Sequence, residues 1–150
     1  MADIVSKERR SRNMSAIKSK NTKPEVYFRK ALFRRGIRYR NNVSHVFGHP
    51  DMFLARYNTA IFIHGCFWHR HPGCKFAYTP KSNIAFWNKK FSENIARDAN
   101  VKAGLRSSGI KCLVVWECTV KQMQKDSARE NEICNKVLDF LSSEELYQEF

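Results

Sequence analysis

The sequence predicts an α/β fold in which a mixed β-sheet is flanked by helices, and three observations support this prediction. Residues 52–54 and 59–63 are two short runs rich in β-branched and aromatic side chains, joined by turn formers, which predicts an antiparallel hairpin. A long stretch with helical periodicity follows over residues 83–107. Residues 110–116 are then nearly all apolar, as in a strand covered on both faces. A long helix between a hairpin and a buried strand favours a mixed sheet with helices on both faces.

Length and charge narrow the class of protein. The chain of 150 residues suits one domain that spans residues 1–150 and buries a core. Lys and Arg number 27 against 14 Asp and Glu, a formal charge of +13, so the expected partner is a polyanion, with nucleic acid ahead of an anionic membrane surface. No apolar run reaches the roughly 18 residues of a membrane-spanning helix, and the start lacks the apolar segment of a signal peptide. We therefore expect a cytoplasmic monomer with no membrane partner.

Three segments are predicted before the hairpin. Residues 1–21 are a basic arm with too little apolar surface for a core helix, and they either lie on a phosphate backbone or form a solvated terminus. Residues 22–25, Thr-Lys-Pro-Glu, have the pattern of a capping box, which predicts a helix that ends at Gly36. Residues 37–43 are predicted to form a short strand.

After the hairpin, the predicted order is helix, strand, helix. Ser82 is predicted to cap the helix over residues 83–107. Residues 127–130, Ser-Ala-Arg-Glu, form a second capping box that opens a last helix. The tail over residues 143–150 is expected to be mobile or loosely docked. The inner stripe of the long helix is predicted at Trp87, Phe91 and Ile95, with residues 98–101 as its candidate continuation.

The register of the hairpin decides which polar groups meet at its open end. If Tyr57 and Asn58 are the two loop residues, Asp51 lies opposite His64, with Cβ atoms about 5 Å apart. A carboxylate and an imidazole in this position could hold a metal-bound phosphate and a water molecule. The sequence therefore predicts the centre of the chemistry at this end of the hairpin.

Cysteine spacing predicts a metal site. Cys66, His71 and Cys74 follow a C-x4-H-x2-C pattern, and Cys118 comes just after the buried strand. Three ligands in a tight loop with a distant fourth are typical of a structural zinc site with three cysteines and one histidine. Thiolates and imidazole suit Zn2+ better than Mg2+, and four protein ligands leave no open position for catalysis. The alternative is a set of buried free thiols beside surface histidines.

Several segments together resemble the very short patch repair endonucleases. They are Arg-Asn-Met at 12–14, Glu25, Gly-x-Pro-Asp at 48–51, the FxHGCFWH segment at 62–69, FWxxKxxxN at 86–94, Arg-Asp at 97–98 and VVWEC at 114–118. The resemblance covers about residues 8–118 and implies a fold related to the PD-(D/E)xK nucleases with a structural zinc loop. It also implies Mg2+-dependent nicking of double-stranded DNA on the 5′ side of the T in a T:G mismatch, which begins repair of deaminated 5-methylcytosine. A mismatch-repair matchmaker protein and a repair polymerase are the further partners implied.

The magnesium site has to be assigned from the side chains present. In the wider PD-(D/E)xK pattern the strand after Asp51 carries acid-x-lysine, and those places here hold Phe62 and His64. Asp51 supplies the hard oxygen that Mg2+ prefers, and it is the predicted metal ligand. The backbone carbonyl of Ile63 is the second predicted ligand.

Proton transfer is assigned to histidines whose ordinary pKa is near 6.5. His69 is the predicted general base for the attacking water and His64 stabilises the phosphate or the leaving group, although the two roles are interchangeable on the sequence alone. Glu25 either orients a metal-bound water or acts only in the capping box.

Flat side chains in and beside the cysteine loop predict recognition of a distorted base pair. Aromatic wedges can enter a base stack, and a mismatched step opens more easily than a paired one. The resemblance implies that three rings enter from the major groove and that Met14 enters from the opposite side. The predicted wedges are Phe67, Trp68 and Trp87, and further DNA contacts are predicted from Arg12, Lys90 and Asn94.

Two other functions are compatible with these features. A zinc-stabilised DNA-binding protein without catalysis would need the charge, the cysteine loop and the aromatic rings, but not Asp51. A restriction-type nuclease would cut both strands of paired DNA.

Overall fold

The computed structural model describes residues 21–150, so the predicted basic arm up to residue 20, with Arg12 and Met14, lies outside the described residues. The sheet has five strands in the order β1-β2-β3-β4-β5. β1, β2 and β3 are antiparallel, whereas β3, β4 and β5 are parallel to one another. The elements in chain order are α2 (Lys23–Arg34), β1 (Arg40–Asn41), β2 (Met52–Leu54), the 3-10 helix η1 (Ala55–Tyr57), β3 (Thr59–His64), α3 (Ile84–Ser107), β4 (Lys111–Trp116), α4 (Glu117–Lys125), α5 (Ser127–Ser142) and β5 (Tyr147–Glu149).

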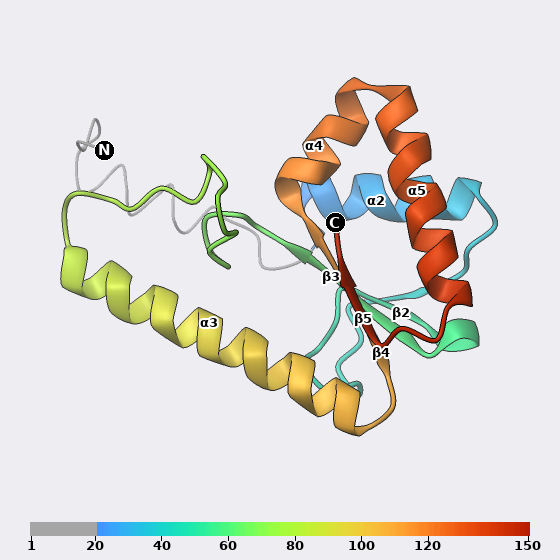
Figure 1. The fold of residues 1–150 in the computed structure, drawn as a ribbon, viewed down its shortest axis with the longest axis horizontal. Coiled ribbons are helices and arrows are strands. Elements are labelled where there is room, and N and C mark those ends of the chain that lie inside the picture. The colour runs from blue at the N-terminus through green and yellow to red at the C-terminus, as the bar shows by residue number, and fades with distance from the viewer. Residues whose placement is uncertain (1–20) are drawn as a thin grey trace.

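Helices cover both sides of this sheet, and the predicted mixed α/β architecture is confirmed. Among residues 21–150, α2, α4 and α5 lie on one side of the sheet, and the long α3 crosses the other side (Figure 1). All six residues of β4 are buried. Because side chains alternate along a strand, Leu113 and Val115 pack beneath α2, α4 and α5, while Val114 and Trp116 belong to the cluster on the side of α3.

The helix ends mostly follow their capping residues. Thr22 accepts a hydrogen bond from the Glu25 amide at 3.4 Å, as the capping box predicts. α2 ends at Arg34, and Gly36 has a φ of +86°, in the left-handed region that glycine adopts without steric cost. The cap of α5 was predicted one residue late, because Asp126 rather than Ser127 accepts the amide, from Ala128 at 3.0 Å.

The start and the inner face of α3 also differ from the prediction. Its N-cap is Asn83, in a left-handed conformation, in place of Ser82. Ile95 is 53% exposed and Asn94 only 6%, so the predicted inward position of Ile95 was wrong. The helix packs closely near its other end, where a Cβ on Gly104 would lie 2.2 Å from Cε1 of Phe47.

The register of the hairpin corrects the prediction by two residues. The connection consists of η1 and Asn58, so Met52 pairs with Ile61 and Asp51 does not lie opposite His64. A 3-10 turn uses more residues than the two-residue loop that was assumed. The shift is even, and side chains therefore keep the faces that the prediction gave them.

Three further segments were predicted incompletely. The strand expected over residues 37–43 is only Arg40–Asn41, and α4 was not predicted at all. The tail is not loosely docked, since β5 pairs with β4 and the Phe150 amide donates to the Val114 carbonyl at 3.0 Å. Within residues 21–150, no helix has the length and apolar character needed to cross a membrane.

Candidate active site and metal centre

Four thiol and imidazole ligands converge beside the ends of β3 and β4. The ligand atoms of Cys66, His71, Cys74 and Cys118 all lie within 4.8 Å of one another. His71 Nδ1 is 3.4 Å from Cys118 Sγ, and the Cys118 amide donates to Cys66 Sγ at 3.4 Å. Zinc–sulfur bonds of about 2.3 Å in a tetrahedron require ligand separations of this order. These residues fit a metal ion, and Cys118 joins them from the first turn of α4.

The loop from Cys66 to Thr79 is also held by an arginine that the sequence analysis did not single out. The Arg70 guanidinium donates to the carbonyls of Phe67, Ala77 and Tyr78 at 3.2, 2.8 and 2.9 Å. Its other side lies over the Phe91 ring of α3, at 3.9 Å from the centroid. Five donors in a rigid plane allow one arginine to fix several carbonyls at once, so Arg70 fixes the shape of this loop.

The predicted wedge residues form one aromatic cluster. The ring centroid of Phe67 lies 5.2 Å from Trp68 and 5.4 Å from Trp87, and the two tryptophans are 5.8 Å apart. All three are partly exposed, as is Lys90. Asn94 differs from its predicted contact with DNA: it is 6% exposed and its amide donates to the Trp68 carbonyl at 2.9 Å. In this structure Asn94 supports the loop rather than facing outward.

Asp51 stands just before β2, against the backbone of β3. Its Oδ2 accepts a hydrogen bond from the Ile63 amide at 2.7 Å. Burial raises the pKa of Asp51 to about 7, more than this hydrogen bond lowers it. The carboxylate therefore adjoins the main chain of Ile63, the predicted second metal ligand, although the register places it away from the partner position of His64.

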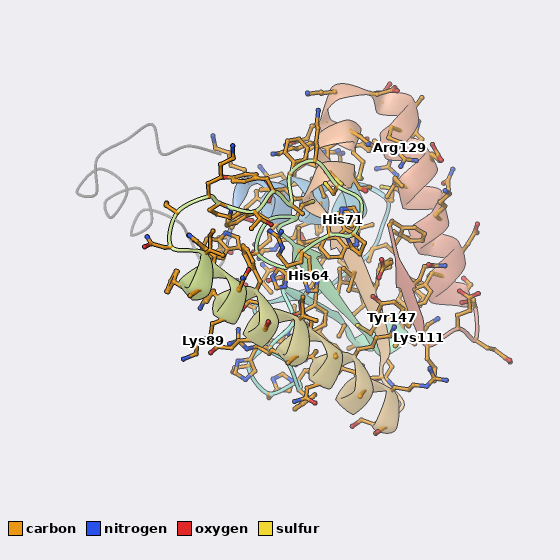
Figure 2. All side chains as sticks on the ribbon, turned by 60° about the vertical axis from the view of Figure 1, so that its left-hand side comes forward. His64, His71, Lys89, Lys111, Arg129 and Tyr147 are labelled. Carbon is orange, nitrogen blue, oxygen red and sulfur yellow. The ribbon has the colours of Figure 1, made fainter. Side chains whose placement is uncertain are left out.

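Two histidines stack at the end of β3. The His64 and His69 rings are parallel, with centroids 3.9 Å apart and an interplanar angle of 4°. Burial, with the neighbouring His69, lowers the pKa of His64 to about 3, so this imidazole is neutral near pH 7. Figure 2 shows His64 and His71 close together, at the end of the sheet opposite Lys111 and Tyr147.

A carboxylate from α3 orients the second histidine. His69 Nδ1 lies 2.7 Å from Asp98 Oδ2. A carboxylate on Nδ1 fixes the tautomer that leaves Nε2 free to accept a proton. Asp98 was not predicted as a site residue, although its place in the Arg-Asp pair at 97–98 and the inward stripe of the helix were the available signals.

The His64, His69 and Asp98 group is better suited to protons than to a metal ion. Their ligand atoms lie within 4.8 Å of one another. The stacked rings, with centroids 3.9 Å apart, however, hold their nitrogen lone pairs in two parallel planes, which is a poor geometry for sharing one ion, and one nitrogen of His69 already contacts Asp98.

Glu25 lines a cavity of about 960 Å³ beside the stacked histidines. It is 4% exposed, and its Oε2 accepts from the Asn21 amide at 2.9 Å and from Arg29 Nη2 at 3.0 Å. The carboxylate is therefore more than a helix cap. Asp51, His64, His69 and Asp98 line this cavity with it.

A carboxylate and an oriented imidazole line one cavity of a strongly basic chain, an arrangement suited to hydrolysis of nucleic acid. Comparisons with known proteins define the class further. The family model of the DNA mismatch endonuclease Vsr matches residues 2–75. The type II nicking enzyme V.NmeAIP of Neisseria meningitidis is 43% identical over 139 residues, which cover 93% of this chain and 99% of that protein.

Two further relatives agree with this match. The DNA mismatch endonuclease Vsr of Escherichia coli is 35% identical over 125 residues, 83% of this chain and 80% of the relative. The type II nicking enzyme V.XorIIP of Xanthomonas oryzae is 38% identical over 129 residues, 86% and 94% of the two chains. The chain belongs to the Vsr family of DNA endonucleases. It is therefore a hydrolase whose substrate is DNA, as predicted, and the alternative of a DNA-binding protein without catalysis is set aside.

Proposed function

We propose that this endonuclease nicks one strand of double-stranded DNA on the 5′ side of the T in a T:G mismatch, in a Mg2+-dependent reaction that begins very short patch repair of deaminated 5-methylcytosine. The observation that carries the proposal is the meeting of Asp51 with the His64, His69 and Asp98 group in one cavity. Relatives named as a mismatch endonuclease and as nicking enzymes favour single-strand cleavage over the restriction-type alternative.

The metal ligands in this proposal are the Asp51 carboxylate and the carbonyl of Ile63, and Glu25 lies in the same cavity to orient water. A bound Mg2+ would supply Lewis-acid activation of the phosphate. The raised pKa of Asp51 favours a partner of positive charge, because burial makes an isolated carboxylate costly.

The two histidines take different roles. His69 removes the proton of the attacking water at Nε2, while Asp98 on Nδ1 stabilises the imidazolium that forms. The water oxygen bonds to phosphorus as the bond from phosphorus to the leaving sugar oxygen breaks. His64 has a lowered pKa and stays neutral, which suits a hydrogen-bond donor to phosphate or the leaving group better than a base.

Recognition of the mismatch is assigned to the loop and to α3. Phe67, Trp68 and Trp87 enter the base stack as wedges, held by Arg70 and by Zn2+ in the four-ligand cluster. Arg12 and Met14 complete the contact, and Lys90 binds a phosphate or a base edge. The function also implies a single nuclease domain over residues 1–150, related to PD-(D/E)xK nucleases and monomeric, which hands the nick to a matchmaker protein and a repair polymerase.

One assay tests the function. Duplexes with a T:G mismatch and fully paired duplexes are incubated with Mg2+, and strand breaks are resolved on denaturing gels. The wild type is expected to nick the mismatched duplex alone. Asp51→Asn is expected to lower the nicking rate by about 10³-fold or more while binding is retained, since the metal loses its charged ligand.

The matched control is Asp139→Asn, an equal change of charge on the exposed side of α5. It is expected to nick at the wild-type rate. Equal cutting of paired DNA, or full activity of Asp51→Asn, would refute the proposal.

A further inference from the structure

Trp116 occupies the place where the metal centre and the histidine pair adjoin. It is the last residue of β4, directly opposite His64 in the parallel register with β3. It is 7% exposed and precedes the cluster residue Cys118 by two positions. The ring therefore lies between two groups of functional side chains that have no ligand in common.

Its contacts form an unbroken series of rings. The indole stacks on His71 with centroids 4.2 Å apart and an interplanar angle of 8°. Its edge meets His64 at 5.3 Å and 72°, and His64 stacks on His69 at 3.9 Å. Aromatic pairs in such arrangements are stabilising beyond the burial of area. These contacts connect the ring of His71 through the indole to those of His64 and His69.

The polar atom of this indole suggests why a tryptophan is present. Trp116 Nε1 is buried and has no hydrogen-bond partner among residues 21–150. Buried indole N–H groups usually find an acceptor, and leaving a buried donor unpaired costs free energy of folding. A leucine or phenylalanine would fill part of the space without that cost. The broad flat surface between the two histidines is the property that only tryptophan supplies here.

We propose that Trp116 is a positioning residue that couples the Cys/His metal cluster to the histidines of the catalytic site. A bound metal ion would fix the orientation of His71, and the indole, stacked on His71, would in turn fix the position of the His64 ring that it contacts. The stacking of His64 on His69 would then hold His69 against Asp98. The metal cluster would then contribute to the geometry of the general base as well as to the fold. This inference rests on the proposed function for the roles of the histidines.

The test compares Trp116→Leu and Trp116→Phe with Cys112→Ala, a packing change on the same face of β4. Metal content and the visible spectrum of the Co2+-substituted protein report the cluster without reference to activity. Binding of the T:G duplex and the single-turnover nicking rate at saturating DNA separate affinity from chemistry. Side-chain 15N spectra of the histidines report the rings directly.

Trp116→Leu is expected to keep its metal and its DNA affinity while the nicking rate falls about 10- to 100-fold, as for other outer-shell partners. Trp116→Phe, which retains a ring, is expected to fall less, and Cys112→Ala to match the wild type. Chelation of the metal is expected to shift the His64 signal of the wild type and to leave that of Trp116→Leu nearly unchanged, whereas His69, inside the metal-held loop, is expected to shift in both proteins.

The two proposals fail in different ways. A wild type that does not nick T:G duplexes refutes the proposed function, while the spectra still decide the coupling. Wild-type histidine signals and an unchanged rate in a folded, metal-loaded Trp116→Leu overturn the role of Trp116. If the leucine variant loses its metal, Trp116→Phe decides, and unaltered His64 and His69 signals in that variant overturn the inference.

Discussion

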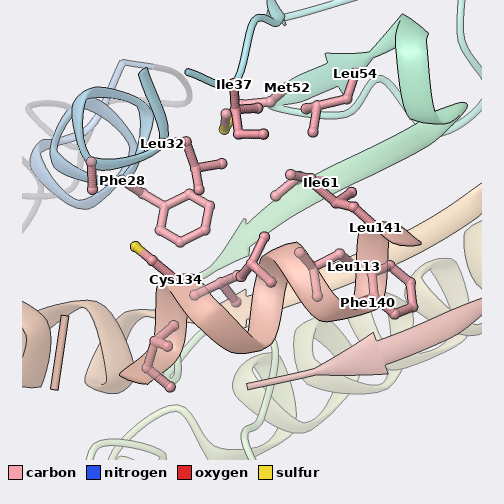
Figure 3. Packing of buried hydrophobic residues seen from close by; sticks show 14 of the residues in the cluster. Phe28, Leu32, Ile37, Met52, Leu54, Ile61, Leu113, Cys134, Phe140 and Leu141 are labelled. Carbon is pink, nitrogen blue, oxygen red and sulfur yellow. The ribbon is translucent and has the colours of Figure 1, made fainter. Parts of the chain in front are cut away.

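The two faces of the sheet are built in different ways. Beneath α2, α4 and α5 lies a large apolar cluster that includes Phe28, Leu113 and Ile133, each no more than 1% exposed (Figure 3). The opposite face has a smaller apolar cluster, and next to it are a cavity, a group of metal ligands and the stacked histidines. The face beneath α2, α4 and α5 is stabilised by burial of apolar surface. The face beneath α3 depends also on directed contacts, namely hydrogen bonds, ring stacking and the metal ligands. Stability and catalysis can therefore be perturbed separately.

The largest expected effect is on the face of the sheet that carries the metal ligands and the stacked histidines. Cys74→Ser should abolish stable metal binding and nicking together, because one of the four ligands, a thiolate, is lost and the aromatic loop is released. Metal content, nicking of the T:G duplex and proteolysis within residues 66–79 measure this. Cys134→Ala removes a thiol from the other face and should keep the metal. Full metal content in Cys74→Ser would contradict the assignment of this ligand.

The converse effect is expected from the apolar face. Leu113→Ala should lower the free energy of unfolding by about 2–5 kcal/mol, the range for a fully buried leucine. The folded protein should nick at a nearly unchanged rate at low temperature. Urea unfolding and nicking rates at the same temperature measure the two quantities. A large loss of rate in fully folded Leu113→Ala would show that the two faces are not separable.

A smaller effect is expected from Arg70→Lys. Lysine keeps the charge but has no planar fork for the carbonyls of the loop. The nicking rate should fall about tenfold, since a small misplacement of the wedge residues is costly. Arg129→Lys on α5 is the matched control and should leave the rate unchanged. Equal rates in the two variants would mean that Arg70 is not needed to shape the loop.

The smallest effect, on the apolar face, depends on pH. Tyr27, Arg34 and Arg35 surround Glu130 and hold its pKa below the ordinary value of 4.5, with the hydrogen bond from Tyr27 as the largest cause. A lowered folded-state pKa means that the contribution to stability is complete above about pH 4.5 and is lost as the pH falls through the folded-state value.

Glu130→Gln should therefore lower the unfolding free energy by about 1 kcal/mol near pH 7, and the difference from the wild type should shrink in acid. Thermal unfolding across pH 3–7 measures it. Glu132→Gln, on the same helix but exposed, is the control and should show little change. A difference that grows in acid would have the wrong sign.

Local patterns predicted the apolar face well. The capping box at Thr22, the left-handed Gly36 and the apolar run of β4 each depend on neighbours in the chain, so they can be read without the fold. The ligand group Cys66, His71, Cys74 and Cys118 was also predicted together, because three members share one loop.

The other face needed long-range information. Asp98 meets His69 across 29 positions, and Arg70 meets Phe91 on another element. Trp116 faces His64 only because β3 and β4 are parallel with a particular register. The predicted hairpin register was wrong because η1 lengthened the turn. β5 was not predicted because its sequence is short and polar, and it forms a strand only by pairing with the edge of β4.

The close approach of Gly104 to the Phe47 ring has a mechanical meaning. A helix of 24 residues, about 36 Å long, behaves as a rigid rod on this scale. Gly104, where the helix approaches Phe47, lies about two turns along the helix from Asp98. A methyl group added at Gly104 would require either the Phe47 ring or the helix to shift, and any shift of the helix would be transmitted along it to the Asp98 carboxylate that orients His69.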